Sequence, residues 1–313
     1  MSLFAPVLAC LLACSSQSAT PQLVGVFGRP DPLEPTVRPT GRTLVSGFGS
    51  NAIHVFDTAT GAFETTIAPV PGAQSIVTGP DGDLFACAEA INQILRIDPE
   101  TLTIVSPFVF DDLGTGLDET GGLNGPTSAI FGPDGNLYVA SFNTDEILRY
   151  DGSTGAFLDV FVAAGSGALN GPDAGMAFGP GEDLFVPSFF NHRILRYDGT
   201  TGTFLSTFIS SSPGNMFQPR AIVFEGSFCY VASSLNNRVL RYDLNGVFQN
   251  RFTTDNQPYS MAFQPQDGHL YVVSLGLNSV RKHDGVGGKL INTIIASGAG
   301  GLAGATYLHF LVP

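Results

Sequence analysis

Four carboxylates lie in a glycine-rich stretch, residues 110–126, and are the first candidates for chemistry. They are Asp111, Asp112, Asp118 and Glu119, and five glycines separate or follow them. Oxygen ligands of this kind bind Ca²⁺, and a glycine-rich loop can fold several of them around one ion. The spacing is not that of an EF-hand loop. The pattern therefore leaves two alternatives, a calcium site or an acidic loop exposed to solvent.

A second candidate site comes from one position that varies among otherwise similar sequence units. It opens the first predicted strand of each unit and is occupied by Gln74, Thr127, Ala174, Arg220, Tyr259 and Thr306. A position that only folds a unit should look alike in every copy, so this variety predicts a pocket. Arg220 would hold an anion, Tyr259 would stack or hydrogen-bond, and His192 lies in a neighbouring turn. The predicted ligand-binding residues are Gln74, Thr127, His192, Arg220 and Tyr259, with ordinary loop variation as the alternative.

Other catalytic patterns are missing from the sequence. The five histidines are scattered, no Ser-His-Asp order is legible, and no glycine-rich phosphate loop leads from a strand into a helix. No Cys/His cluster has the spacing of a zinc site. These observations favour binding over catalysis.

The units themselves are internal repeats, and residues 137–161 and 184–208 are nearly the same sequence. Each unit closes on an aspartate: Asp57, Asp98, Asp151, Asp198, Asp243 and Asp284. The gaps between them are 41, 53, 47, 45 and 41 residues, so six units fill the chain. Units of this length must stack on copies of themselves.

Each unit reads as four antiparallel strands. In the third unit these are residues 128–131, 137–142, 147–150 and 157–162, separated by turn sequences such as Gly132-Pro133-Asp134-Gly135. Such a blade is apolar on both faces and needs a neighbour on each side, which predicts an all-β, six-bladed β-propeller. The lack of tryptophan argues against a WD-type propeller.

Closure of the ring is expected to involve both chain ends. Residues 305–311 resemble a first strand, with Phe310 at the place held by Phe131, Phe178, Phe224 and Phe263. They would complete the first blade, whose own candidate strand (34–38) is rich in proline. Residues 23–27 look like a spare outer strand. A seventh blade built from terminal strands is the alternative.

Recurring polar residues are expected to be structural. The six closing aspartates suit hairpin turns, and Asn51, Asn92, Asn237 and Asn278 suit one left-handed turn position. Arg96, Arg149, Arg196, Arg241 and Lys282 recur two residues before the aspartates and are interpreted as inter-blade pairs or edge residues.

The first 18 residues differ from the rest and predict an export leader. A short apolar run contains Val7-Leu8-Ala9-Cys10 and Leu11-Leu12-Ala13-Cys14, which both resemble the lipobox of bacterial lipoproteins. Cys14 is the preferred lipidation site, because the tether-like Ser15-Ser16-Gln17-Ser18 follows it. Cys10 is the alternative lipidation site. Residues 1–18 lack Lys and Arg, so another export leader is the alternative. Residues 19–313 would form the single propeller domain.

Composition limits the partners. The formal charge is −13 with only two lysines, which disfavours a nucleic-acid role. We expect a monomer that reaches the membrane only through a lipid anchor, in the bacterial cell envelope, periplasm or extracellular space.

The segments Asn191-His192-Arg193-Ile194 and Asn236-Asn237-Arg238-Val239, each leading to an aromatic and an aspartate, resemble the NHL repeat. The resemblance covers about 270 residues from Thr43 onward. It implies a six-bladed propeller that commonly acts as a binding platform. The wider clan also resembles the streptogramin lyases and the calcium-dependent lactonase propellers.

Streptogramin-lyase-like blades tend to carry Glu directly after the second strand. The corresponding positions are Gly47, Ala88, Ser141, Ser188, Ser233 and Ser274, none of them glutamate, which speaks against lyase chemistry. The sequence therefore predicts a non-catalytic scaffold that binds a protein, peptide or glycan and needs no cofactor. A metal-dependent lactonase-like or lyase-like enzyme, using Ca²⁺, is the alternative.

Overall fold

The computed structural model describes residues 41–112, 114 and 117–311. Contacts divide the chain into residues 1–38 and 39–313, and the described residues all belong to the second unit. The predicted leader with Cys14, and the strand candidates at 23–27 and 34–38, lie outside the described residues.

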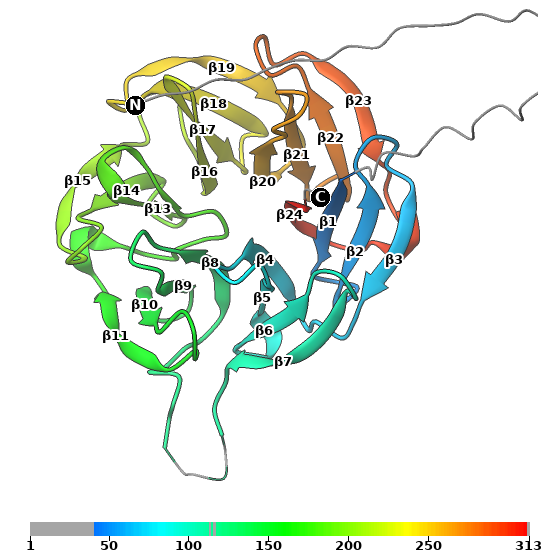
Figure 1. The fold of residues 1–313 in the computed structure, drawn as a ribbon. Coiled ribbons are helices and arrows are strands. Elements are labelled where there is room, and N and C mark those ends of the chain that lie inside the picture. Colours follow the sequence, from blue (N-terminus) through cyan, green and yellow to red (C-terminus); the bar gives the residue numbers. More distant parts are fainter. Residues whose placement is uncertain (1–40, 113, 115–116, 312–313) are drawn as a thin grey trace, which may run out of the picture. The chain divides into compact units, whose positions relative to one another are not determined.

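Six sheets of four antiparallel strands form a closed ring (Figure 1). The second blade contains β4 (Ala73–Thr78), β5 (Leu84–Ala88), β6 (Gln93–Asp98) and β7 (Thr103–Val109). The third contains β8 (Pro126–Phe131), β9 (Leu137–Ser141), β10 (Glu146–Tyr150) and β11 (Phe157–Val162). The fourth contains β12 (Ala177–Phe178), β13 (Leu184–Ser188), β14 (Arg193–Tyr197) and β15 (Phe204–Ile209).

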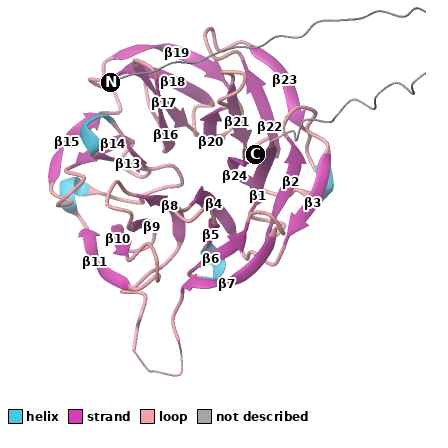
Figure 2. Cartoon of the chain, in the orientation of Figure 1, coloured by secondary structure: helices cyan, strands magenta, loops and turns pink. Residues whose placement is uncertain are grey.

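The fifth blade contains β16 (Pro219–Glu225), β17 (Phe228–Ser233), β18 (Arg238–Asp243) and β19 (Phe248–Thr254). The sixth contains β20 (Pro258–Phe263), β21 (Leu270–Ser274), β22 (Ser279–His283) and β23 (Leu290–Ile295). Short 3₁₀ turns are the only helices among the described residues (Figure 2): η1 (Glu89–Ile91), η2 (Ser166–Ala168), η3 (Pro180–Glu182) and η4 (Ala299–Gly301). None of them is long and apolar enough to span a membrane.

The first blade contains both ends of the described chain. Its strand order is β24 (Ala305–Leu311), β1 (Arg42–Gly47), β2 (Ala52–Asp57) and β3 (Phe63–Ile67). The C-terminal strand therefore supplies the innermost position of the first blade, as the sequence predicts. The six-bladed prediction is confirmed, and the seven-bladed alternative is wrong.

Packing between blades explains why no blade is stable alone. Six buried clusters each combine residues of two neighbouring blades; one joins Leu44 and Val55 of the first blade to Ile76 and Leu95 of the second. Burial of apolar surface is the main stabilising term in folding. Each blade thus supplies half of two cores, which is the physical basis of the repeat.

Aromatic rings link successive blades in a repeated contact. An aromatic side chain on the second strand of one blade meets a phenylalanine on the first strand of the next, edge to face. The pairs are Phe85–Phe131, Tyr138–Phe178, Phe185–Phe224, Tyr230–Phe263 and Tyr271–Phe310. The last pair carries the same contact across the closure, so the predicted equivalence of Phe310 is confirmed.

A polar contact also joins every blade to the next. The residue before the third strand has positive φ in each blade: Asn51, Asn92, Asp145, His192, Asn237 and Asn278. Each side chain accepts a hydrogen bond from a backbone N–H of the next blade, at the start of its first strand or within six residues before it. The donors are Gly72, Gly125, Gly171, Gln218, Gln257 and Ala305. The structural interpretation of the asparagines is confirmed, and His192 holds the same place in the fourth blade.

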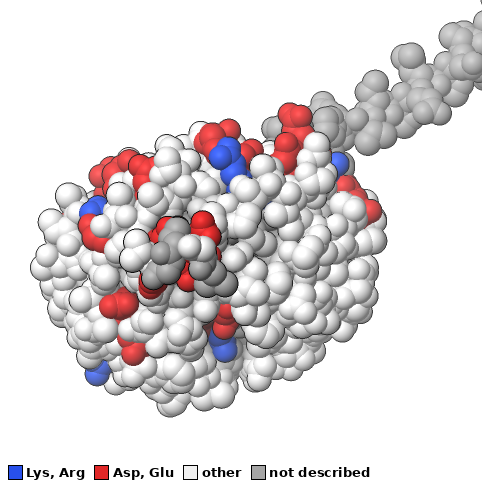
Figure 3. Space-filling model, turned by 90° about the horizontal axis from the view of Figure 1, so that it is seen from below, with Lys and Arg blue, Asp and Glu red and all other residues white. Residues whose placement is uncertain are grey.

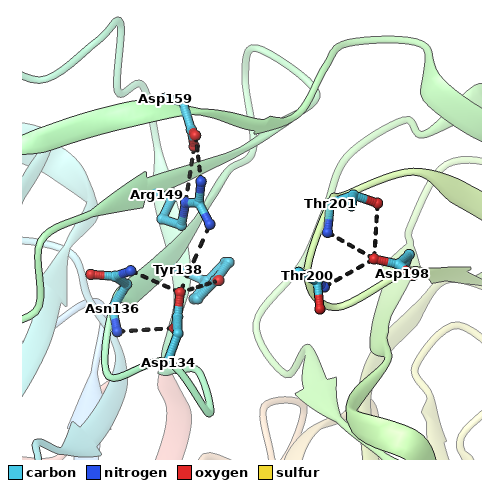
Figure 4. Close-up of polar contacts among 8 residues, drawn as sticks. All are labelled: Asp134, Asn136, Tyr138, Arg149, Asp159, Asp198, Thr200 and Thr201. Atoms are coloured by element: carbon cyan, nitrogen blue, oxygen red, sulfur yellow. Dashed lines mark hydrogen bonds and ion pairs between the residues drawn. The ribbon is translucent and has the colours of Figure 1, made fainter.

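The recurring aspartates and arginines are structural as well (Figure 4). The carboxylate of Asp198 accepts hydrogen bonds from the backbone N–H groups of Thr200 and Thr201, and the other closing aspartates cap their turns in the same way. Arg149 binds Asp159 and Asp134 of its own blade. Arg96, Arg196 and Lys282 also pair within their blades, so the inter-blade interpretation is wrong.

Candidate ligand-binding pocket

One cavity of about 340 Å³ receives residues from all six blades and therefore lies on the propeller axis. It opens on the face that carries the turns between second and third strands. The lining residues are Phe48, Gly49, Gln74, Glu89, Thr127, Phe142, Asp173, Arg220, Tyr259, Leu275, Gly304 and Thr306.

Four of the five predicted ligand-binding residues line this cavity: Gln74, Thr127, Arg220 and Tyr259. Thr306, from the same varying position, lines it too, whereas Ala174 does not. His192 is not a lining residue. Its Nδ1 accepts the backbone N–H of Gln218 at 3.1 Å, and its ring stacks near Phe217, so it serves the inter-blade contact described above.

Arg220 is held rigidly at the cavity wall. Its Nη1 donates to Asp173 Oδ2 at 2.8 Å. Its guanidinium carbon lies 4.4 Å from the Phe189 ring centroid and 4.2 Å from that of Tyr259, so the group contacts two rings. The Tyr259 ring faces Arg220, and its predicted stacking or hydrogen bonding with a ligand stays a prediction. Asp173 thus offsets the positive charge of Arg220, and the anion site at Arg220 stays a prediction.

Asp173 was missed by the sequence reasoning. Its side chain is about 1% exposed, and Oδ1 also accepts the N–H of Ala174 at 2.8 Å. Burial raises the pKa of this carboxyl to about 6, although the nearby Arg220 charge lowers it and Glu89 raises it further. Asp173 lies one residue before the varying position, where the other blades have Ala73, Pro126, Pro219, Pro258 and Ala305. An aspartate among prolines and alanines is the signal that was available.

Glu89 is the second missed residue, and it corrects an assignment. β5 ends at Ala88, so the residue directly after this second strand is Glu89 and not Ala88. The Gln74 Nε2 donates to Glu89 Oε2 at 2.5 Å. Burial raises the pKa of Glu89, with the Gln74 hydrogen bond and the Arg220 charge opposing that shift.

The two threonines use their hydroxyls to join blades. Thr127 Oγ1 donates to the Pro172 carbonyl at 3.0 Å, and Thr306 Oγ1 donates to the Ala73 carbonyl at 2.8 Å. Both threonines line the cavity, but their hydroxyl groups already donate hydrogen bonds to these carbonyls. The other polar side chains of the lining are those of Gln74, Glu89, Asp173, Arg220 and Tyr259.

A glycine brings Asp173 and Arg220 together. Gly175 leaves its own blade and pairs with the fifth: its N–H donates to the Arg220 carbonyl, and its carbonyl accepts from Ile222, both at 2.9 Å. A Cβ at this position would lie 2.4 Å from the Ala221 Cβ, so only glycine permits this approach. The same departure shortens β12 to two residues.

The acidic connection between β7 and β8 projects from the ring (Figure 1). Figure 3 shows a face with few charged groups, where acidic side chains lie beside the grey residues of this connection and at several other places. Asp118 Oδ1 accepts the N–H and hydroxyl of Thr120, and Asp112 Oδ1 accepts the Gly114 N–H. Within residues 41–112, 114 and 117–311, no group of three or more His, Cys, Asp or Glu side chains is placed to hold a metal ion.

These features define the chain as a six-bladed β-propeller with an axial pocket, and the comparisons with known proteins agree on the fold. No family model and no curated protein matches the sequence. A Bacteroides caccae protein of unknown function superposes with a TM-score of 0.67 at 15% identity, covering 88% of this chain and 100% of its own.

Two further structures are propellers with known roles. Virginiamycin B lyase from Staphylococcus aureus gives a TM-score of 0.56 at 18% identity, covering 79% of this chain and 78% of that one. The nidogen/laminin complex gives a TM-score of 0.67 at 14% identity, covering 87% of this chain and 98% of that one. At such identities the likeness concerns the fold alone.

Proposed function

We propose that this chain is an exported, NHL-like β-propeller that binds a protein, peptide or glycan at its axial pocket without chemistry. The observation that supports this most is the contrast between repeat and pocket. The blades repeat their turns, aromatic contacts and inter-blade hydrogen bonds, whereas the lining side chains differ from blade to blade. Function in a repeat fold resides in such grafted sites.

The rim of the pocket supports a partner larger than the cavity. The turns between second and third strands carry exposed apolar residues in five blades: Phe48, Ile91, Phe190, Leu235 and Leu277, between 42% and 57% exposed. Apolar side chains gathered around a hollow are typical of interaction sites. One structural neighbour is itself a protein complex, nidogen with laminin, which is in keeping with this use of the fold.

A pocket-filling variant tests the proposal. Peptide and glycan arrays probed with the wild-type chain should give ligands whose binding Leu275→Trp weakens about 10-fold or more, because the larger ring occupies the cavity. Val286→Trp is the control, since Val286 is 84% exposed in the turn between β22 and β23 and belongs neither to the lining nor to the rim. Equal binding by both variants would place the ligand elsewhere and overturn the proposal.

An enzyme is the second candidate, and one observation favours it. Glu89 and Asp173 both have raised pKa values in one pocket, as general acids and bases often do. Mass spectrometry of array ligands after incubation separates the candidates. Ligand recovered unchanged supports binding alone, whereas a Glu89-dependent product would favour the enzyme.

Export through a lipid anchor on Cys14 is part of the proposal and rests on the sequence. Cys14 follows a lipobox-like segment and precedes a polar tether. In a bacterial host, mass spectrometry of the mature N-terminus should find Cys14 as the first residue, carrying lipid. A mature chain that begins elsewhere, with unmodified cysteine, would remove the anchor from the proposal.

A further inference from the structure

The charge balance of the axial pocket is negative. Its charged lining residues are Glu89, Asp173 and Arg220. Asp173 pairs directly with Arg220 at 2.8 Å, so these two charges offset each other. Glu89 accepts a hydrogen bond from the neutral amide of Gln74, and within the described part of the chain it forms no ion pair. Its charge is thus the one left for a ligand.

An unused acceptor lies beside this carboxylate. The Gln74 side chain is 3% exposed and gives its Nε2 to Glu89, but its Oε1 has no hydrogen-bond partner among the described residues. A buried acceptor without a partner is costly, so a ligand N–H at this point would relieve that cost. Glu89 and Gln74 together thus present two acceptors to one donor group.

The walls around these acceptors are aromatic and aliphatic. Phe48, Phe142 and Leu275 line the cavity, and Phe48 is 42% exposed at its mouth. Aromatic faces attract cations, and the same side chains pack against apolar groups. An anion, by contrast, would meet the charge of Glu89, and Arg220 already gives its Nη1 to Asp173, although its buried Nε has no hydrogen-bond partner among the described residues.

Resting on the proposed function, the geometry points to the ligand class: we propose that the pocket binds an ammonium group attached to an apolar body. The ammonium donates to Glu89 and to Gln74 Oε1, and the apolar body packs against Phe48, Phe142 and Leu275. A small organic amine and the lysine side chain of a peptide with apolar neighbours share this chemistry.

Three matched probes test the charge preference by calorimetry on the full chain: phenethylamine, 2-phenylethanol and 3-phenylpropionate. Phenethylamine should bind about 10-fold or more tightly than the alcohol, and the carboxylate should bind most weakly. Glu89→Gln should abolish the advantage of the amine. Glu119→Gln, an acid on the β7–β8 connection outside the pocket, is the control and should leave it unchanged.

The outcomes separate this inference from the proposed function. If the alcohol or carboxylate binds as tightly as the amine, and Leu275→Trp blocks it, the pocket remains a binding site but the ammonium class is wrong. If Leu275→Trp leaves amine binding unchanged, both proposals fall. An acetylated tripeptide amide with lysine between two phenylalanines distinguishes a peptide ligand from a small amine. Acetylation of that lysine should remove its binding.

Acidification gives a second readout. The ionisable groups facing the pocket are Glu89, Asp173, Arg220 and Tyr259. As the pH falls through the raised pKa of Glu89, this carboxylate loses the charge that attracts the ammonium group. As it falls through the pKa of about 6 at Asp173, that residue no longer offsets the positive charge of Arg220. Amine affinity should therefore fall between about pH 7 and pH 5, while 2-phenylethanol stays constant. A pH-independent amine affinity would contradict the inference.

Discussion

Asp173→Ala is expected to lower the free energy of unfolding by about 3–5 kcal/mol, because it leaves the charge of Arg220 partly buried without a partner. The guanidinium is 19% exposed and fixed between the rings of Phe189 and Tyr259, so it cannot turn freely to water. Denaturant unfolding of both proteins at pH 7 measures the difference. A loss below about 1 kcal/mol, the value of an exposed pair, would contradict the buried pairing.

Removal of Arg220 should lower the free energy of unfolding by less than removal of Asp173. In Arg220→Met the remaining carboxyl can take up a proton, because its pKa is already about 6 and the Arg220 charge is one of the causes that keep it low. The double variant should lose less than the sum of the two single losses, since the pair is removed as a unit. Strict additivity would show that the two residues act independently.

The same pair has a predicted pH dependence. The folded-state pKa of Asp173 lies above the ordinary value of 3.8, so the protonated form is favoured on folding. The stability gained by protonating this group is therefore fully present below about pH 4 and is lost as the pH rises to about 6, which is separate from the stability that the ion pair itself provides. In Arg220→Met the upper end of this window should move to higher pH. Carboxyl titration followed by NMR measures it directly.

Much of the architecture was predictable because repetition constrains it strongly. A unit that cannot bury its two apolar faces must stack, and Phe310, at the position of four other phenylalanines, marked the C-terminal strand as a first strand. Four pocket residues followed from the same logic, since equivalent strand positions converge on the axis. These predictions rest on alignment of the units and need no distances.

Two pocket residues, Glu89 and Asp173, were not predicted from the sequence. In strands, successive side chains point to opposite faces, so an error of one residue moves an assignment to another environment. Glu89 was lost in this way, because the end of β5 was placed one residue early. Asp173 was overlooked although it stands where the other blades have alanine or proline, and its pairing with Arg220 depends on the close approach at Gly175, which no local pattern reveals.

His192 illustrates the opposite error. Its ring nitrogen suggests chemistry, yet it stands at the turn position where four other blades have asparagine. The turn requires positive φ and a short-range acceptor, which asparagine, aspartate and histidine can all supply. Aligning all six turns, rather than the asparagines alone, would have identified its hydrogen bond to the next blade.

Deletion of residues 305–313 is expected to abolish cooperative folding, because it removes the strand that closes the ring. β24 pairs with β1 from Arg42–Leu311 to Gly47–Ala305 and buries Leu308. The strand forms six residue pairs with β1, and each hydrogen bond contributes about 0.5–1.5 kcal/mol. Burial of a leucine adds about 1.5–3 kcal/mol. Together these contributions approach the whole stability of a domain, about 5–15 kcal/mol. Circular dichroism during thermal unfolding measures the loss.

Two controls make this result specific to closure. Deletion of residues 312–313 alone leaves β24 intact and should preserve the wild-type transition. A synthetic peptide of residues 305–313, added to the truncated chain, should restore folding in proportion to its concentration, because β1 offers it an unpaired edge. The same peptide with Phe310→Ala should restore less, since it lacks the ring contact with Tyr271. A truncated chain that unfolds cooperatively at the wild-type temperature would show that the ring does not depend on its last strand.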